Sequence, residues 1–346
     1  MTRRRCVPAI TLWVAAALLS GAAFSQPATA ETTMTFSHFV PTGHRVHAGA
    51  EMWAKSIEEA SGGDIKVRIF PAQQLGKAAD HYDMIASGQV GAGWFVSGYS
   101  PGRFPIIEAG ELPFLMTDAA TGARVLHEWY AEKAREEMPE IRFCLFATHD
   151  PGRIHTRAKV ETISDLKGMK IRPASASVGN YLAALGAIPV KLAAPEARQG
   201  VERGVVDGVT FPWNTIINFG LAEDLVHHVD LPFYVPMAMY GVNPAFYENL
   251  SPENRKVIDD HCTPEWSERI TSDWATWEQD GRQELEDIGG HTIVTVAPED
   301  RAPWVEKAQG LYADWAAQVD QRYGDGAAGP MMEDLQARLS QAGAGF

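Results

Sequence analysis

Two arginines stand where a side chain could bind an anion. Arg172 closes the short segment Lys170-Ile171-Arg172, and Pro173 follows it. Proline has no backbone N–H and ends strand pairing, so we expect this guanidinium at a strand end. Ligands of open α/β sheets bind at such ends, and a guanidinium offers a fork of donors that fits a carboxylate. Arg153 follows another strand candidate in a turn-like segment; for both arginines, a structural ion pair or a solvated side chain is the alternative.

Other chemically active patterns are missing. The sequence contains no G-x-S-x-G, H-E-x-x-H, C-x-x-C or phosphate-binding P-loop. His38, His44 and His47 lie close in sequence, but no cysteine or paired carboxylate completes a metal site. We expect these histidines to be solvated or to pack in loops, and His227-His228 to lie at the surface. The sequence therefore predicts no enzyme and no metal, with a secreted α/β enzyme of unknown reaction as the alternative.

The composition indicates an acidic globular protein. Of 346 residues, 45% are hydrophobic and 10% aromatic, which suits one large or two medium domains. The chain has 30 Lys and Arg against 44 Asp and Glu, a net charge of −14, so we expect no nucleic acid partner. With 3 cysteines, neither a disulfide framework nor a cysteine-ligated zinc site is expected.

The first thirty residues have the pattern of a secretory signal peptide. Three consecutive arginines precede an apolar run at residues 10–19, and Ala28-Thr29-Ala30 offers a cleavage site before Glu31. The run is shorter than the ~20 residues of a membrane span, although an uncleaved anchor is the alternative. We therefore expect a periplasmic protein. Its remaining cysteines, Cys144 and Cys262, could pair in an oxidising compartment, but the sequence does not give their distance.

Strand and helix patterns alternate along the mature chain, which is typical of parallel sheets covered by helices. In residues 44–61, Val46, Ala50, Trp53, Ile57 and Ala60 recur at helical spacing and form an apolar face. We expect two α/β units and a C-terminal helical run. The expected strands are residues 34–39, 65–70, 89–96, 141–148, 169–172, 189–192, 205–209 and 291–296; the expected helices are residues 44–61, 77–87, 177–185, 196–203 and 253–287, with a last long helix around 304–315.

Four segments resemble the solute-binding proteins of TRAP (tripartite ATP-independent periplasmic) transporters, of the DctP type. They are GAEMWAKSIEEASGGDIKVRIFPAQQLG (49–76), GELPFL (110–115), ISDLKGMKIRP (163–173) and PEARQGVERGVVDGVTFP (195–212). The segments occur in the family's order, and the resemblance extends from about residue 35 to about residue 290.

The resemblance implies a periplasmic-binding-protein-like fold, in which two α/β domains close on a ligand and a long helix spans both. We place domain I at residues 31–153 with a return segment of about 240–346, and domain II at 154–239. Arg172 matches the arginine that pairs with the ligand carboxylate, and Arg153 matches a second arginine near the site in many members. The implied partners are a small organic acid and the membrane permease subunits. A ligand-sensing role shares the fold, and no cofactor is implied.

The resemblance also places further residues in or beside ligand-facing loops: Phe39, Trp94, Phe211, Trp213 and Asn214. Core packing is the alternative for each ring. Together they predict a pocket with apolar walls, and hence an organic acid with an apolar or planar body.

Two other ligand classes stay open. An ectoine-like zwitterion, held by cation–π contacts, is second. A C4-dicarboxylate is third, because it needs a second cationic or donor-rich end, for which Arg153, His38 and His44 are candidates. Val209-Thr210 lacks the acidic residue that the family's metal-assisted branch carries nearby, so we expect no metal.

Overall fold

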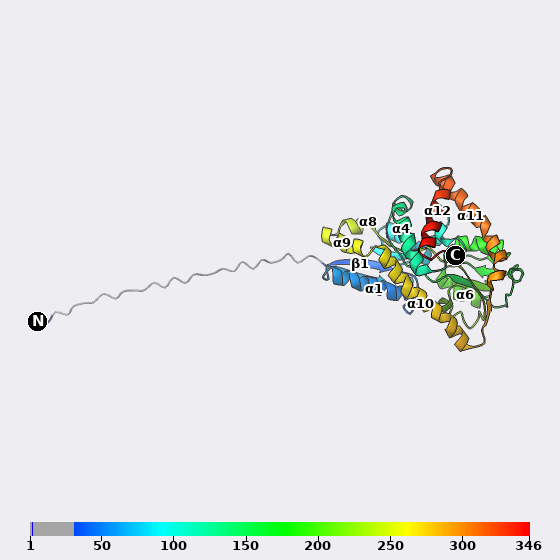
Figure 1. The fold of residues 1–346 in the computed structure, drawn as a ribbon. Coiled ribbons are helices and arrows are strands. Elements are labelled where there is room, and N and C mark those ends of the chain that lie inside the picture. The colour runs from blue at the N-terminus through cyan, green and yellow to red at the C-terminus, as the bar shows by residue number, and fades with distance from the viewer. Residues whose placement is uncertain (1, 3–30) are drawn as a thin grey trace. The chain divides into compact units, whose positions relative to one another are not determined.

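The computed structural model describes residue 2 and residues 31–346, and Glu31–Phe346 forms one compact unit. The expected signal peptide therefore lies, apart from residue 2, outside the described residues. Within these residues, no helix combines the length and the apolar character needed to cross a membrane. Strands and helices alternate and build two sheets (Figure 1).

The first sheet has the strand order β2-β1-β3-β10-β4. The β1 strand is parallel to β2 and β3, whereas β10 is antiparallel to both β3 and β4. The chain thus returns from the second sheet to insert one strand here, and the sheet is mixed rather than purely parallel. The bounds are β1 (Thr32–Ser37), β2 (Ile65–Phe70), β3 (Ala92–Val96), β4 (Arg142–Phe146) and β10 (Ala238–Val242).

The second sheet has the order β11-β9-β5-β8-β6-β7. It is also mixed, because β5 runs antiparallel to its neighbours β8 and β9. The segment that carries Arg153 was expected as a turn and is instead part of β5. The bounds are β5 (Gly152–Thr156), β6 (Lys170–Arg172), β7 (Ile188–Pro189), β8 (Gly208–Phe211), β9 (His227–Tyr234) and β11 (Thr292–Thr295).

The long helix expected over residues 253–287 is two helices, α9 (Pro252–Asp260) and α10 (Pro264–Ile288). The side chain of Thr263 accepts a hydrogen bond from the backbone N–H of Trp266, and Pro264 is the first residue of α10. Proline disfavours a helical conformation in the residue before it, so a new helix starts here.

The α10 helix is the expected helix that spans both halves. It packs against α1 (Arg45–Ala60) and α4 (Ala119–Glu137) beside the first sheet, and against α7 (Trp213–Asn218) beside the second. Figure 1 shows it as one long diagonal helix. In α1, four members of the predicted apolar face, Val46, Ala50, Trp53 and Ile57, are buried, whereas Ala60, the last residue of the helix, is exposed. The other helices are α2 (His81–Ala86), α3 (Pro105–Glu108), α5 (Ala176–Ala184), α6 (Ala197–Glu202), α8 (Pro244–Glu248), α11 (Ala302–Tyr323) and α12 (Ala328–Gln341).

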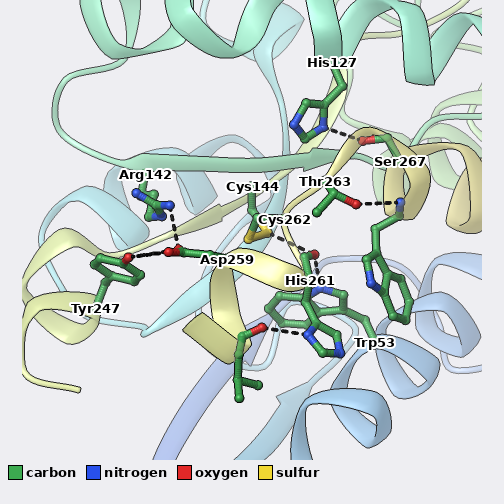
Figure 2. Close-up of a disulfide and its surroundings, with 12 residues drawn as sticks. Trp53, His127, Arg142, Cys144, Tyr247, Asp259, His261, Cys262, Thr263 and Ser267 are labelled. Carbon is green, nitrogen blue, oxygen red and sulfur yellow. Dashed lines mark hydrogen bonds and ion pairs between the residues drawn. A yellow bond between two sulfur atoms is a disulfide. The ribbon is translucent and has the colours of Figure 1, made fainter. Parts of the chain in front are cut away.

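A disulfide joins Cys144 of β4 to Cys262 in the turn between α9 and α10 (Figure 2). The two residues are 118 positions apart in sequence. Beside the bond, Trp53 of α1 donates its indole N–H to the carbonyl of His261 at 2.9 Å. The bond therefore ties the start of the spanning helix to the first sheet, and the pairing left open by the sequence is present.

Two hydrophobic clusters form the core, and each draws residues from both sheets. One contains Phe146 of the first sheet and Ile171 of the second. The other contains Trp94 of the first sheet and Phe211 of the second. The second cluster surrounds the cavity described next.

Candidate ligand-binding site

A small cavity lies among residues from both sheets and from α10. Counted as the space open to the centre of a water molecule, it measures about 40 Å³. A single water needs about 10–15 Å³ of such space, so the cavity suits a small molecule. It is lined mostly by apolar and aromatic side chains: Phe39, Val40, His44, Trp94, Val96, Tyr99, His149, Arg172, Ala174, Ala194, Phe211, Thr215, Phe219, Pro236, Ala238 and Trp274.

Arg172 lies at the end of β6 and is only 1% exposed. Its Nε–H donates to the carbonyl of Leu192 at 3.0 Å, and Nη1 donates to the carbonyl of Thr210 at 3.2 Å. Nη2 donates to the Tyr99 hydroxyl at 3.3 Å. The guanidinium carbon lies 4.4 Å from the centre of the Phe211 ring, close enough for a cation–π contact. Two neutral carbonyls, a hydroxyl and a ring thus hold the charge in place.

The positive charge of Arg172 has no protein counter-ion in the described part of the chain. Among residues 31–346, no carboxylate oxygen lies within 4.0 Å of its nitrogens. A guanidinium carries five N–H donors, and three are used, so one N–H on each terminal nitrogen is left over. Burying an unpaired charge is costly. A carboxylate in the cavity would supply both the missing charge and the missing acceptors.

Tyr99 connects the two halves at this point, and sequence reasoning missed it. It lies in the short 3-10 helix Ser97–Tyr99 that follows β3. Its hydroxyl oxygen accepts from Arg172 and also from the backbone N–H of Ala194 at 3.1 Å. Since the oxygen accepts twice, its own hydrogen is free to be donated into the cavity. Its position directly after a strand end was the one available sequence signal.

Three aromatic residues predicted for the site line the cavity. Phe39 and Trp94 stand 4.5 Å apart between ring centres, and the Trp94 N–H donates to the carbonyl of Ala147 at 3.0 Å. Phe211 stacks on Phe219 at 5.7 Å between ring centres. These rings form apolar walls of the cavity, and the Phe211 ring faces the Arg172 charge.

A buried polar chain crosses the cavity wall. His44 caps α1, where its Nδ1 accepts from the backbone N–H of Val46, and its Nε2 lies 3.2 Å from Thr215 Oγ1. Thr215 in turn donates its hydroxyl and its backbone N–H to Glu278 of α10. Burial lowers the pKa of His44 to about 3 and raises the pKa of Glu278 to about 7. The chain fixes α1, α7 and α10 to one another, and His44 contributes no positive charge near neutral pH.

Arg153 lies outside the residues that line the cavity. Its Nε donates to Asp230 and its Nη1 to Asp150, both at 3.1 Å. Its guanidinium carbon is 5.0 Å from the centre of the Trp213 ring. Both acidic partners compensate its charge, so this arginine has the contacts of a structural ion pair.

Three other predicted site residues also lie outside the cavity lining. Trp213 is buried among His155, His228 and Arg153. Asn214 donates its side-chain amide to the carbonyl of Trp277 at 3.0 Å. His38 is fully buried rather than solvated, and its Nε2 lies 2.9 Å from Nδ1 of His47.

The expectation that His227-His228 lies at the surface is wrong for His228, which is 1% exposed. Its Nδ1 lies 2.8 Å from His155 Nδ1, and its Nε2 lies 3.0 Å from His291 Nδ1. Burial lowers the pKa of His228 to about 2 and that of His155 to about 3, and it also lowers the pKa of His291, so the row of rings is neutral near neutral pH. Within the described residues, no group of three or more His, Cys, Asp or Glu has an arrangement that could hold a metal ion.

Comparison with known proteins decides the family. The model of the DctP family, "Bacterial extracellular solute-binding protein, family 7", matches residues 36–318 of this chain. The chain belongs to this family.

Solved structures of TRAP solute-binding proteins share the fold. One from Rhodoferax ferrireducens T118, in complex with copurified benzoate, is 28% identical, with a TM-score of 0.86 over 90% of this chain and 98% of that chain. A marine metagenome protein specific for aromatic acid ligands, in complex with metahydroxyphenylacetate, is 31% identical, with a TM-score of 0.85 over 90% and 99%.

One sequence relative is named for a ligand of a different kind. The 2,3-diketo-L-gulonate-binding periplasmic protein of Escherichia coli is 25% identical over 247 residues, which cover 68% of this chain and 74% of that protein. As a TRAP solute-binding protein, the chain shares the two-domain fold of this family of periplasmic proteins. The members of this family bind small organic ligands, work with membrane permease components and are not enzymes.

Proposed function

We propose that this TRAP solute-binding protein captures a small aromatic monocarboxylate. The observation that carries the proposal is the Arg172 guanidinium, which is buried without a carboxylate partner among residues 31–346 and faces a cavity walled by aromatic rings. The two spare N–H groups of Arg172 would bind the ligand carboxylate, and the rings of Phe39, Trp94 and Phe211 would contact its planar body.

A single negative charge fits this cavity better than two. Among the described side chains that line the cavity, Arg172 is the only one with a permanent positive charge. Burial lowers the pKa of both His44 and His149 to about 3, so neither supplies a second positive charge near neutral pH. Arg153, the expected second arginine, is held by Asp150 and Asp230. A C4-dicarboxylate would therefore bury one carboxylate without a counter-charge, which is costly.

A zwitterion of the ectoine type also fits less well. Its cationic part would need a carboxylate or an open aromatic face. No Asp or Glu lines the cavity within the described residues, and the Phe211 ring already faces the Arg172 guanidinium on one side. The cation of such a ligand would be left beside a like charge.

Capture would proceed by closure of the two halves around the acid. Tyr99, from the first-sheet half, contacts Arg172 and Ala194 of the second, so these hydrogen bonds form only when the halves are together. The bound carboxylate would add further contacts at the same place. The closed, loaded protein would then deliver the acid to the membrane permease components.

The ligands in two of the related structures, benzoate and metahydroxyphenylacetate, have the single ring and single carboxylate that this argument requires. They support the proposal.

A thermal-shift screen tests it. Ligand at 100-fold its Kd stabilises a protein by about 2.7 kcal/mol, which raises the melting temperature measurably. We expect single-ring monocarboxylates such as benzoate to raise it, and succinate and ectoine at the same concentration to leave it unchanged. A larger shift with succinate or ectoine, or turnover of any added acid, would contradict the proposal.

A further inference from the structure

The polar side chains at the cavity differ in the hydrogen-bonding capacity that they have left. His44 and Thr215 are committed, because His44 Nδ1 accepts from Val46 and the Thr215 hydroxyl donates to Glu278. Arg172 and Tyr99 have N–H and O–H donors to spare, as described above. Both of these groups suit an anion and neither demands a donor from the ligand.

His149 is the exception, because it has an acceptor to spare. It follows β4 in the connection to β5, lines the cavity and is 6% exposed. Its Nδ1 lies 2.5 Å from the backbone carbonyl of Asp150. A carbonyl oxygen can only accept, so Nδ1 carries the hydrogen of that bond.

The other nitrogen of His149 is therefore a bare acceptor. Burial, together with the nearby positive charges of Arg172 and Arg153, lowers the pKa of this imidazole to about 3. A neutral ring with its hydrogen on Nδ1 has only a lone pair on Nε2. Within residues 31–346, Nε2 has no hydrogen-bond partner, although edge contacts with Trp274 at 5.3 Å and Tyr234 at 5.8 Å hold the ring.

We propose that Nε2 of His149 accepts a hydrogen bond from a hydroxyl group of the bound acid, so that His149 selects hydroxylated over unsubstituted aromatic acids. The inference rests on the proposed function and deepens it. The carboxylate would meet the donors of Arg172 and Tyr99, and the hydroxyl would meet the acceptor of His149. The same lone pair would repel a second carboxylate.

The strength of this selection follows from the cost of leaving a buried acceptor unpaired. Such an acceptor, once covered by a ligand without a donor, loses its solvation and gains nothing in return. A site that hydrogen-bonds a ligand hydroxyl therefore discriminates against the analogue that lacks it. We expect a preference of about tenfold or more in Kd.

A series of ligands tests the inference on the native protein. Benzoate is compared with its 2-, 3- and 4-hydroxy and fluoro derivatives, and phenylacetate with mandelate, by titration calorimetry. Fluorine is about as small as a hydroxyl but cannot donate. We expect at least one hydroxylated acid to bind about tenfold or more tighter than its parent, with the fluoro analogue resembling the parent.

His149→Phe provides the second arm, since it keeps an aromatic ring but has no acceptor. It should reduce the hydroxyl preference, measured in the variant as the ratio of the Kd values for the parent and the hydroxylated acid, to about onefold. His127→Phe is the matched control: His127 is also buried, but it bonds Ser267 outside the cavity, and its loss should leave the preference intact. If His149→Phe does not fold, the ligand series still decides.

The outcomes separate the two claims. Equal affinities for hydroxylated, fluorinated and unsubstituted acids would overturn the role of His149 and leave the aromatic-acid proposal standing. A hydroxyl preference that survives in His149→Phe would also overturn that role. If none of these acids binds, the proposed function itself is wrong.

Discussion

Replacing Arg172 with methionine removes the charge while keeping a long, flexible side chain. In the native protein, three N–H groups of Arg172 hold Leu192, Thr210 and Tyr99, and two remain for the ligand. A hydrogen bond to a charged group contributes about 1.5–3 kcal/mol, so two contribute about 3–6 kcal/mol. Removing one member of a buried charge pair costs about 3–5 kcal/mol. We therefore expect Arg172→Met to weaken benzoate binding by about 3–5 kcal/mol, roughly 10²–10⁴-fold in Kd.

The ligand-free protein should respond in the opposite direction. Arg172→Met removes a buried charge that the described part of the chain does not pair, so its free energy of unfolding without ligand should equal or exceed that of the native protein. Arg172→Lys keeps the charge but loses the planar fork, and it should also bind poorly. A loss of affinity without a loss of stability distinguishes a binding arginine from a structural one.

Titration calorimetry with benzoate and urea unfolding without ligand give the two quantities. Arg157→Met is the matched control, because Arg157 bonds Val201 and Asp224 away from the cavity and should keep native affinity. An Arg172→Met protein that binds within about threefold of native would refute the reasoning. So would a variant that loses binding only together with a large loss of stability.

Three other changes probe the site and its support. Tyr99→Phe removes a hydroxyl that accepts twice and can donate to the ligand; we expect about 1–3 kcal/mol weaker binding, and native affinity in calorimetry would exclude that role. Burial raises the pKa of Glu278 to about 7 from the ordinary 4.5, so the folded protein holds a proton that the unfolded chain has lost. The stability that Glu278 contributes is therefore fully present below pH 4.5, and it decreases as the pH rises from 4.5 to about 7. The Glu278→Gln variant should lose that slope, and parallel urea-unfolding profiles for both proteins would contradict it. Reducing the Cys144–Cys262 disulfide removes a cross-link between residues 118 positions apart in the sequence. The loop-entropy model assigns such a cross-link about 5 kcal/mol of stability, so reductant should lower the urea midpoint. An unchanged midpoint would show that the bond adds no stability.

The part of the site that local sequence could predict is the part that lies at strand ends. Arg172 was recognisable because Pro173 marks where β6 stops, and Phe211 is the last residue of β8. Phe39 lies two residues after β1 and Trp94 lies in the middle of β3, so for these two rings the family resemblance was the stronger signal. Parallel neighbours such as β6 and β8 bring such ends together within one sheet. These four residues line one cavity.

What local sequence could not predict depends on pairing between distant segments. The contacts of Arg153 with Asp230, 77 positions later, depend on β5 and β9 being neighbours. No local pattern shows that β9 exists, since Pro232 interrupts its apolar residues. The same pairing buries His228, which was expected at the surface.

Residues with a role in hydrogen bonding were the hardest to recognise. Tyr99 and His149 look like ordinary loop residues in the sequence. Their significance comes from which of their atoms are already used: Tyr99 accepts from Ala194, and His149 donates to Asp150. Which donors and acceptors remain unused can be seen only in the three-dimensional structure.

The central claim is that the buried Arg172 charge binds a carboxylate in an aromatic cavity, and a pair of ligands tests it directly. Benzoate and benzamide have nearly the same shape, but only benzoate carries a charge. Titration of the native protein should show benzoate binding at least about 100-fold tighter, the effect of ~3 kcal/mol of charge pairing. Equal affinity for benzamide would mean that the charge of Arg172 plays no part in recognition, and would contradict the account.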